Sequence, residues 1–186
     1  MYKESCEGCK LSRGHRESIG GIIKLDGDWI LNHYGGAEGF LGWMTLQPRQ
    51  HRMDFADLGP KEIKALGSNI QRVDKALGVY WNREDNFPDD PIKRIYVVYF
   101  FESAFNKAGE EWHMHIHLIP RTRELGTNRR HEYKPWKVAA WKIAQLSDKF
   151  WFPPRYRIRD RNGQLMNEGA VVALMEYLRN SLASTS

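Results

Sequence analysis

Three histidines alternate with apolar residues between Trp112 and Arg121, and this pattern constrains the fold more than any other part of the chain. In an extended strand, residues two apart point to the same face and lie about 6.6 Å apart. The alternation therefore predicts a strand with three histidines in a row on one face and apolar side chains on the core face. The histidines are His113, His115 and His117, and the apolar residues are Met114, Ile116 and Leu118. Because every buried imidazole nitrogen needs a hydrogen-bond partner or water, such a row indicates a chemical site.

The elements before this row predict the fold class. Three short strands are expected first, then one amphipathic helix, then a buried strand that pairs with the histidine strand. The strands are expected at 20–25, 29–32, 40–46 and 95–101, and the helix runs from Pro60 to a stop at Gly78, with an apolar stripe of Ile63, Leu66, Ile70, Val73 and Leu77. This order indicates an α+β domain with a mainly antiparallel sheet and one packed helix.

The C-terminal third differs in composition. Residues 121–161 hold 12 Lys and Arg against 4 Asp and Glu, a local charge of +8 in a chain whose net charge is +5. We therefore expect two parts, a catalytic domain at 1–125 and a basic, Trp-rich helical extension at 126–186. Within the extension, helices are expected at 136–150 and after Asn167, which can cap a helix whose apolar stripe is Ala170, Leu174, Leu178 and Leu182.

Composition predicts the cellular location of the protein. No apolar run approaches the roughly 20 residues that a membrane span needs, and the first residues lack a signal-peptide core. A cytoplasmic protein with no membrane partner is therefore expected. The only two cysteines, Cys6 and Cys9, are too few for a disulfide framework. A Cys-x-x-Cys pair in the cytosol favours metal or redox chemistry, with two free thiols as the alternative.

The run His-Met-His-Ile-His-Leu-Ile, followed by Pro-Arg, resembles the signature of the histidine-triad nucleotide hydrolases and transferases. The resemblance covers roughly residues 6–123. It implies that His115 attacks an α-phosphorus and forms a covalent nucleotidyl-histidine, which water then hydrolyses. It also implies that His117 contacts phosphate oxygens or the leaving group, and that His113 helps to orient His115. Geometry favours His115 independently, because the middle histidine has a same-face neighbour on both sides to fix its tautomer.

Other residues extend the resemblance or depart from it. Asn32 ends a strand where members of the family place a polar residue on the nucleotide ribose, with a turn cap as the alternative role. Arg121 and Arg123 follow the histidine strand and could reach phosphate oxygens, or could be solvated surface residues. Two departures weaken any assignment of substrate. Glu110-Glu111 stands where many members have a polar phosphate-binding run, and Gly42-Trp43 stands where many have Gly-His.

The resemblance also implies a zinc site. Zinc-bearing branches of the superfamily use a histidine at the position of His51 together with the first histidine of the row. The ligand set is then Cys6, Cys9, His51 and His113. Four protein ligands leave no open coordination position, so this zinc would be structural. It would fix the ring of His113 beside the nucleophile.

Three functions remain open from the sequence. The first is a hydrolase or transferase acting on nucleotide phosphoanhydrides or phosphoramidates, expected as a homodimer because many small family members are dimers. The second is a nucleic-acid end-processing or nucleic-acid-binding protein that uses the basic tail and its tryptophans. The third is a non-catalytic, zinc-stabilised interaction protein. The remaining histidines, His15, His33 and His131, are expected on the surface. The base and the leaving group are not specified.

Overall fold

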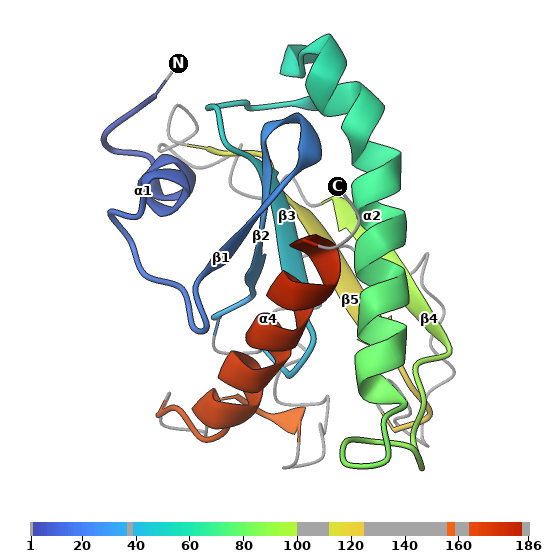
Figure 1. The fold of residues 1–186 in the computed structure, drawn as a ribbon. Helices are drawn as coiled ribbons and strands as arrows, with labels where there is room; N and C mark the ends of the chain where they lie inside the picture. Colours follow the sequence, from blue (N-terminus) through green and yellow to red (C-terminus); the bar gives the residue numbers. More distant parts are fainter. Residues whose placement is uncertain (1, 37–38, 100–111, 125–155, 159–163, 184–186) are drawn as a thin grey trace, which may run out of the picture.

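The structure is a computed structural model, and it describes residues 2–36, 39–99, 112–124, 156–158 and 164–183. Figure 1 shows a twisted sheet with two long helices lying across one face and a short helix near the N-terminus. The helices are α1 (Glu7–Arg13), α2 (Pro60–Trp81) and α4 (Glu168–Ala183), with 3-10 turns η1 (Asp26–Asp28) and η2 (Phe55–Asp57). The strands are β1 (Ile22–Leu25), β2 (Trp29–His33), β3 (Met44–Pro48), β4 (Arg94–Tyr99) and β5 (Ile116–Arg121).

The five strands form one antiparallel sheet in the order β1-β2-β3-β5-β4. The predicted α+β class with a mainly antiparallel sheet is therefore confirmed. Directly paired residues share a face, so the register sorts side chains into rows across the sheet. One row, Leu31–Leu46–Ile116, lies in the hydrophobic core, and the row beside it, Asn32–Thr45–His117, faces the opposite side.

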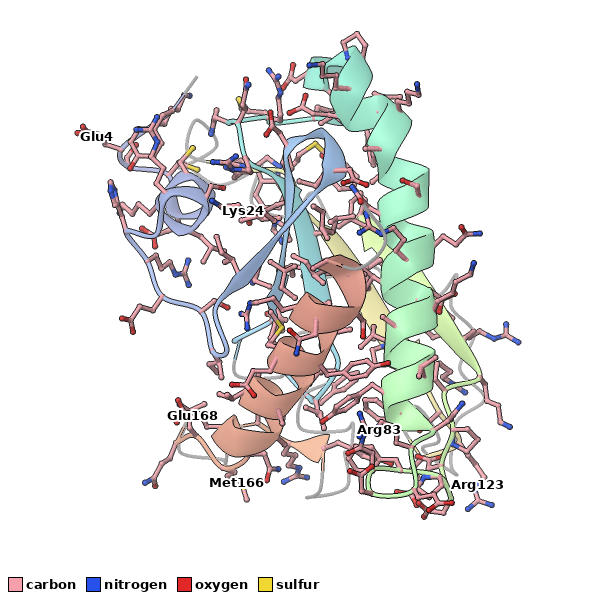
Figure 2. All side chains as sticks on the ribbon, in the orientation of Figure 1. Glu4, Lys24, Arg83, Arg123, Met166 and Glu168 are labelled. Carbon is pink, nitrogen blue, oxygen red and sulfur yellow. The ribbon has the colours of Figure 1, made fainter. Side chains whose placement is uncertain are left out.

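The core lies between the sheet and helices α2 and α4, which contact each other. Met114, Ile116 and Leu118 are buried in it, as the alternation of the histidine stretch predicts. Figure 2 shows the side chains on the same ribbon, with Glu4 at the outer edge beside the N-terminal segment. Because Ile116 lies in this core, the alternation places His117 on the opposite face of the sheet from α2 and α4.

Helix α2 begins at Pro60, where its fixed φ suits the first helical turn. The carboxylate of Glu62 reaches back to accept the backbone N–H of Gly59 at 2.5 Å, which caps the helix. Two expectations about α2 are wrong. The helix continues through Gly78 to Trp81, and Ile63 is 50% exposed. The first turns of α2 extend beyond the strands in Figure 1, so the sheet cannot cover the whole stripe.

Strand β4 is not the buried strand that its apolar sequence indicated. It is the last strand of the sheet, and its six residues are half-buried or exposed, with Val97 50% exposed. An apolar run predicts burial only if the strand is central, and strand order depends on pairings distant in sequence. The part of the expected strand at residues 100–101 lies outside the described residues.

The C-terminal helix contributes to the same core as the sheet. Helix α4 begins directly after Asn167 and buries Leu174, Leu178 and Leu182. The expected helix at 136–150 and the tail tryptophans lie outside the described residues, so the division into two parts at residue 125 stays a prediction. No helix within the described ranges combines the length and the apolar character needed to cross a membrane.

A buried carboxylate ties part of the tail to the end of β5. Asp90 is fully buried and accepts hydrogen bonds from Thr122 Oγ1 at 2.6 Å and from the phenol of Tyr156 at 2.9 Å. It also accepts the backbone N–H of Arg123 at 2.9 Å. Charged acceptors in such networks are costly to remove because their donors lose their partner. Asp90 therefore fixes the exit of the histidine strand.

We expect Gly42→Ala to destabilise the protein strongly. Gly42 has φ 86°, and a Cβ there would lie 2.8 Å from Trp81 Cζ3 and 3.2 Å from Pro120 Cγ. Gly14 is the matched control, since its φ is 77° but no atom lies within 4 Å of the Cβ position. Gly14→Ala should cost about 1–2 kcal/mol for the left-handed backbone, and Gly42→Ala about 1–3 kcal/mol more. Denaturant unfolding measures both, and equal losses would show that packing against Trp81 is not limiting.

Candidate active site and metal-binding cluster

The three histidines of the row make different contacts. Only His117 lies within β5, while His113 and His115 lie in the residues just before it. The ring of His115 lies 4.8 Å from that of His117. The ring of His113 lies instead among the two cysteines and His51. His113 therefore belongs to a metal-binding cluster and, together with His115, also lines a pocket, whereas His117 is not among the described residues that line that pocket.

His115 is held in one tautomer. Its Nδ1 lies 3.0 Å from the carbonyl oxygen of His113, and a carbonyl can only accept, so Nδ1 carries the proton. The other nitrogen, Nε2, therefore keeps its lone pair. Burial lowers the pKa of His115, so its neutral form predominates at neutral pH. A neutral imidazole with a fixed tautomer is suited to nucleophilic attack.

His117 is fixed from the opposite side. The indole Nε1–H of Trp43 donates to His117 Nδ1 at 2.9 Å. Burial, with a further contribution from the neighbouring His115, lowers the pKa of His117 to about 3. His117 also belongs to a polar row across three strands, in which Thr45 Oγ1 donates to Asn32 Oδ1 at 2.8 Å. Asn32, Thr45 and His117 therefore form a buried polar strip on the face of the sheet opposite α2 and α4.

Cys6, Cys9, His51 and His113 bring four ligand atoms within 4.8 Å of one another. His113 Nδ1 lies 3.5 Å from Cys6 Sγ and 3.6 Å from Cys9 Sγ, and His51 Nδ1 lies 3.5 Å from Cys9 Sγ. A tetrahedral zinc ion with ordinary bond lengths separates its sulfur and nitrogen ligands by about 3.6 Å. Thiolate and imidazole are the donors that zinc prefers. The residues therefore fit a structural zinc ion.

The surroundings of the cluster favour a metal as well. His113 Nε2 donates to the carbonyl of Pro48 at 2.8 Å, which leaves Nδ1 as the nitrogen that can bind a cation. Burial raises the pKa of the Cys6 thiol to about 11. A bound cation would offset this burial cost by stabilising the thiolate.

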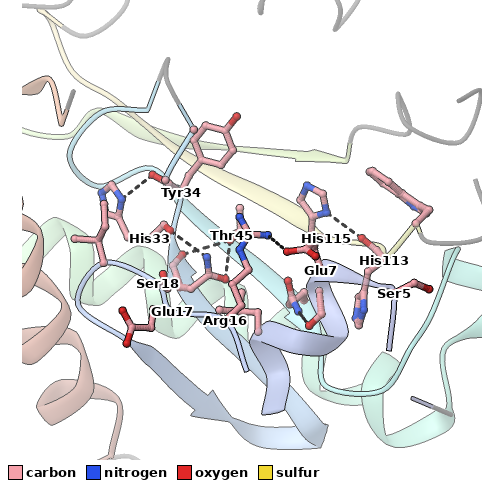
Figure 3. A pocket seen from close by; sticks show the side chains of 18 residues that line it. Ser5, Glu7, Arg16, Glu17, Ser18, His33, Tyr34, Thr45, His113 and His115 are labelled. Carbon is pink, nitrogen blue, oxygen red and sulfur yellow. Dashed lines mark hydrogen bonds and ion pairs between the residues drawn. The ribbon is translucent and has the colours of Figure 1, made fainter. Parts of the chain in front are cut away.

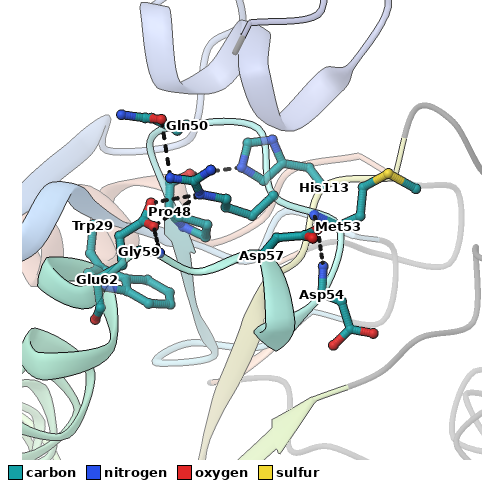
Figure 4. A network of polar contacts seen from close by, with 10 residues as sticks. Trp29, Pro48, Gln50, Met53, Asp54, Asp57, Gly59, Glu62 and His113 are labelled. Atoms are coloured by element: carbon teal, nitrogen blue, oxygen red, sulfur yellow. Dashed lines mark hydrogen bonds and ion pairs between the residues drawn. The ribbon is translucent and has the colours of Figure 1, made fainter.

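An ion pair secures the loop that carries His51. Arg52 Nε lies 3.0 Å from a carboxylate oxygen of Glu62, which is 4% exposed. Arg52 also accepts the backbone N–H of Met114 on its carbonyl at 2.8 Å. Figure 4 shows Glu62 beside Gly59 and Trp29, with His113 on the other side of the network. The loop after β3, the start of α2 and the histidine stretch are therefore fastened together.

A pocket of about 600 Å³ opens beside His115. Its walls come from α1 and the segment after it, from Asn32 and Thr45 of the polar strip, and from His113 and His115. Figure 3 shows Thr45, His113 and His115 around this space. Such a volume suits a small organic ligand. Of the described residues that line it, Arg16 is the only Lys or Arg, and its Nη1 lies 3.3 Å from Glu7 Oε2. In Figure 3 this ion pair lies at the pocket in front of Thr45 and His115.

The residues expected at the substrate site differ in position. Asn32, His113 and His115 line the pocket, so they meet around one space. Arg121 ends β5 four residues beyond His117, roughly 13 Å along the strand, and does not appear among the described lining residues. The roles assigned to these residues stay predictions. Glu110 and Glu111 lie outside the described residues, as does His131.

Three polar residues of the site were missed in the sequence. Thr45 has the strand alternation that would have placed it beside Asn32, but only if the pairing of β2 with β3 were known. Arg16 comes from a segment without regular structure, so no periodicity marks it. Trp43 was noted only as a departure from the family pattern. The sequence does not show which residue accepts the hydrogen bond of its indole N–H.

Solved structures of histidine-triad proteins share this fold. A Hit-like protein involved in cell-cycle regulation from Bartonella henselae matches with a TM-score of 0.57 at 16% identity, over 97% of this chain and 98% of that one. A hypothetical histidine triad nucleotide-binding protein from Sulfolobus tokodaii matches with a TM-score of 0.55 at 13% identity, over 96% and 93%. A zinc-bound histidine triad family protein from Mycobacterium smegmatis matches with a TM-score of 0.53 at 16% identity, over 97% and 94%.

No protein-family model and no curated protein matches the sequence of this chain. At the identities of the solved structures, the likeness establishes the fold of the histidine-triad proteins for this chain.

The expectation that His33 is a surface residue is wrong. His33 is 1% exposed because its register partners are Met44 and, across β3, Leu118, so it points to the core face. In Figure 3 a dashed line joins its ring to the carbonyl of Tyr34, and His33 is also among the residues that line the pocket. Its Nε2 accepts the backbone N–H of Gly42 at 3.1 Å, and its Nδ1 donates to the Tyr34 carbonyl at 2.9 Å. Burial lowers the pKa of His33 to about 4.

This burial predicts a pH-dependent contribution to stability. The folded-state pKa of His33 lies below the value of 6.5 in the unfolded chain, so only the unfolded state takes up the proton as pH falls through 6.5. The contribution is present in full above pH 6.5 and is lost on the way to pH 4. Between about pH 7.5 and pH 5 it should cost about 2 kcal/mol. The His33→Asn variant should be less stable at pH 7.5 but lose less on acidification, measured by denaturant unfolding. Parallel curves for the two proteins would contradict this.

Proposed function

We propose that the protein is a nucleotide phosphohydrolase or nucleotidyl transferase that acts at the α-phosphate through a covalent nucleotidyl-histidine. One observation carries the proposal. The His113 carbonyl holds the proton of His115 on Nδ1, so the Nε2 lone pair is available beside a pocket of about 600 Å³. The histidine-triad fold supports the same chemistry. A cytoplasmic location, a homodimeric state and nucleic-acid binding by the basic tail stay predictions.

The polar strip suits the sugar of a nucleotide. Asn32 Nδ2 donates to the carbonyl of His33 at 3.0 Å, and its Oδ1 accepts from Thr45. An amide with fixed donor and acceptor atoms can order a ribose hydroxyl without moving. The nucleoside would then lie along the strip, with its phosphate toward His115. This orientation supports an in-line attack on phosphorus, because positioning supplies much of the rate in phosphoryl transfer.

Arg16 is suited to the phosphate charge. Its guanidinium can pair with phosphate oxygens in a bidentate way, and its present partner Glu7 is 57% exposed on the side chain. Exposed ion pairs are typically worth less than about 1 kcal/mol, so exchange of Glu7 for a phosphate costs little. Arg121, farther along β5, is proposed to act only on a longer leaving group.

The metal-binding cluster is proposed to hold one structural zinc ion through Cys6, Cys9, His51 and His113. The zinc ion would cross-link the N-terminal helix α1 to the histidine stretch. It would not supply the nucleophile, since protein ligands fill all four coordination positions. His113 would then contribute to the reaction through its backbone carbonyl. Its carbonyl holds Nδ1–H of His115, and its ring is anchored to Pro48.

The His115→Asn variant tests the nucleophile. We expect turnover of nucleoside phosphoanhydrides to fall by at least about 10³-fold, because the atom that bonds to phosphorus is removed. Wild-type protein quenched in base during turnover, where the N–P bond survives, should show the mass of one added nucleotidyl group, and the variant none. The matched control is His15→Asn, an exposed histidine whose ring contacts Tyr2. Turnover of the His115→Asn variant close to that of His15→Asn would refute the assignment.

The Cys9→Ser variant tests the metal. Purified protein should carry about one zinc per chain by elemental analysis, and the variant should lose most of it together with several degrees of Tm. The control is Ser12→Ala on the same helix, which removes a hydroxyl that donates to the Gly8 carbonyl at 2.9 Å but no ligand atom. Stoichiometric zinc in the Cys9→Ser variant would exclude Cys9 as a ligand.

A further inference from the structure

Trp43 makes a buried contact that the proposed reaction does not yet use. Its indole Nε1 lies 2.9 Å from His117 Nδ1, and the residue is 5% exposed. The indole is stacked on Tyr34, with ring centroids 4.5 Å apart and an interplanar angle of 24°. Phe40 packs on it at 5.3 Å. The indole therefore has two aromatic neighbours that hold it in this orientation.

The bond fixes where the proton of His117 lies. An indole N–H can donate but cannot accept, so His117 Nδ1 must offer its lone pair. The proton of a neutral ring is then on Nε2. A protonated ring would carry N–H on both nitrogens, and its Nδ1–H would point at the indole N–H. Trp43 therefore stabilises the neutral Nε2–H form against both the other tautomer and the cation.

Within the described part of the chain, the rings and paired residues found beside His117 do not favour the cation. The ionisable rings among them are His115 at 4.8 Å, on the same stretch, and Tyr34 at 5.5 Å, on the segment after β2. Its register partners are Thr45 on β3 and Val98 on β4, which carry no charge. Burial disfavours the charged ring as well, and it is the largest cause of the lowered pKa of His117.

We propose that Trp43 is a positioning residue that keeps His117 as a neutral Nε2–H donor, and that it thereby selects substrates whose leaving group departs as a stable anion. The inference rests on the proposed function. It assigns nucleoside phosphoanhydrides, rather than phosphoramidates, as the preferred substrate class.

The reaction step shows why the leaving group matters. The Nε2 lone pair of His115 forms a bond to the α-phosphorus, and the bond from phosphorus to the leaving group breaks with its electron pair on that group. A phosphate oxygen can depart with this pair and needs only the hydrogen bond of His117 Nε2–H. An amine nitrogen must receive a proton as it departs, and a neutral imidazole is a far weaker acid than an imidazolium. Water then attacks phosphorus, the N–P bond breaks and its pair returns to Nε2, while the proton of water leaves to solvent.

The tautomer is tested by nitrogen NMR of histidine-labelled protein, with no need for a substrate. Wild-type His117 should show an unprotonated Nδ1 and a protonated Nε2 at pH 7. The Trp43→Phe variant keeps an aromatic ring but removes the donor, so the two His117 resonances should move toward the averaged values of an exchanging ring. The control is Trp81→Phe, because Trp81 Nε1 donates to the Asp90 carbonyl at 3.0 Å, a bond of the same kind elsewhere. It should leave His117 unchanged.

The substrate class is tested with a pair of nucleoside 5′-phosphate derivatives that differ only in an oxygen or a nitrogen leaving atom. Wild-type kcat/KM should favour the anhydride by about 100-fold or more, and in Trp43→Phe this ratio should shrink by roughly tenfold, the effect of one lost hydrogen bond. Trp81→Phe should keep the wild-type ratio even if its stability falls.

Several outcomes separate this inference from the proposed function. Wild-type protein with a protonated Nδ1 on His117, or a Trp43→Phe variant with unchanged tautomer and unchanged substrate ratio, overturns the role of Trp43. A wild-type preference for the phosphoramidate overturns the substrate class. Absence of both turnover and the nucleotidyl adduct in wild-type protein overturns the proposed function, while the tautomer measurement still decides what Trp43 does. Because the first NMR measurement uses wild-type protein, poor folding of a variant does not remove the test.

Discussion

The position of His113 is the constraint on which the rest of the site depends. Its ring is held by the Pro48 carbonyl on one side and faces two thiols on the other, and its own carbonyl holds the ring of His115. One residue therefore joins the N-terminal helix, the end of β3 and the candidate nucleophile. A small rotation of its backbone would disturb all three. The ion pair of Arg52 with Glu62 limits such rotation, because Arg52 is bonded through its carbonyl to Met114, the next residue.

One face of the sheet stabilises the fold, and the other carries polar residues of the candidate site. Leu31, Leu46 and Ile116 bury apolar surface against the helical layer, while the neighbouring row holds an amide, a hydroxyl and an imidazole on the opposite face of the sheet. A shift of one residue in the register between β3 and β5 would turn the His117 side chain toward the apolar core and Ile116 away from it. Core packing thus fixes the alignment that brings Thr45 beside His117.

Local patterns in the sequence were sufficient for some parts of this arrangement. The alternation around His115 predicts which side chains face the core, and the apolar spacing of the last helix predicts its buried stripe, because both depend on periods within one element. Parts that depend on distant pairing were not predictable. His33 is buried because β2 continues one residue farther and pairs with Met44, and Val97 is exposed because β4 lies at the edge.

The same distinction between local sequence patterns and contacts between distant residues applies to the metal-binding cluster and the pocket. Cysteine spacing and a family resemblance were enough to group Cys6 with His51, since metal ligands are few in kind. Nothing local links Trp43 to His117, which are 74 residues apart and meet only when β3 pairs with β5. Contacts of this kind, between one indole and one imidazole, follow from the fold and have no signature of their own.

The burial of α4 in the core has a consequence for how the chain acquires its structure during synthesis. Strand β1 ends at Leu25, whereas the residues that cover the helical face of the sheet include Leu182. At about 5–20 residues per second, roughly 7–30 seconds pass between the synthesis of β1 and that of α4. Throughout this interval the apolar face of the sheet lacks its second helix. Final closure of the core described here is therefore a late event, which must wait until α4 has been made.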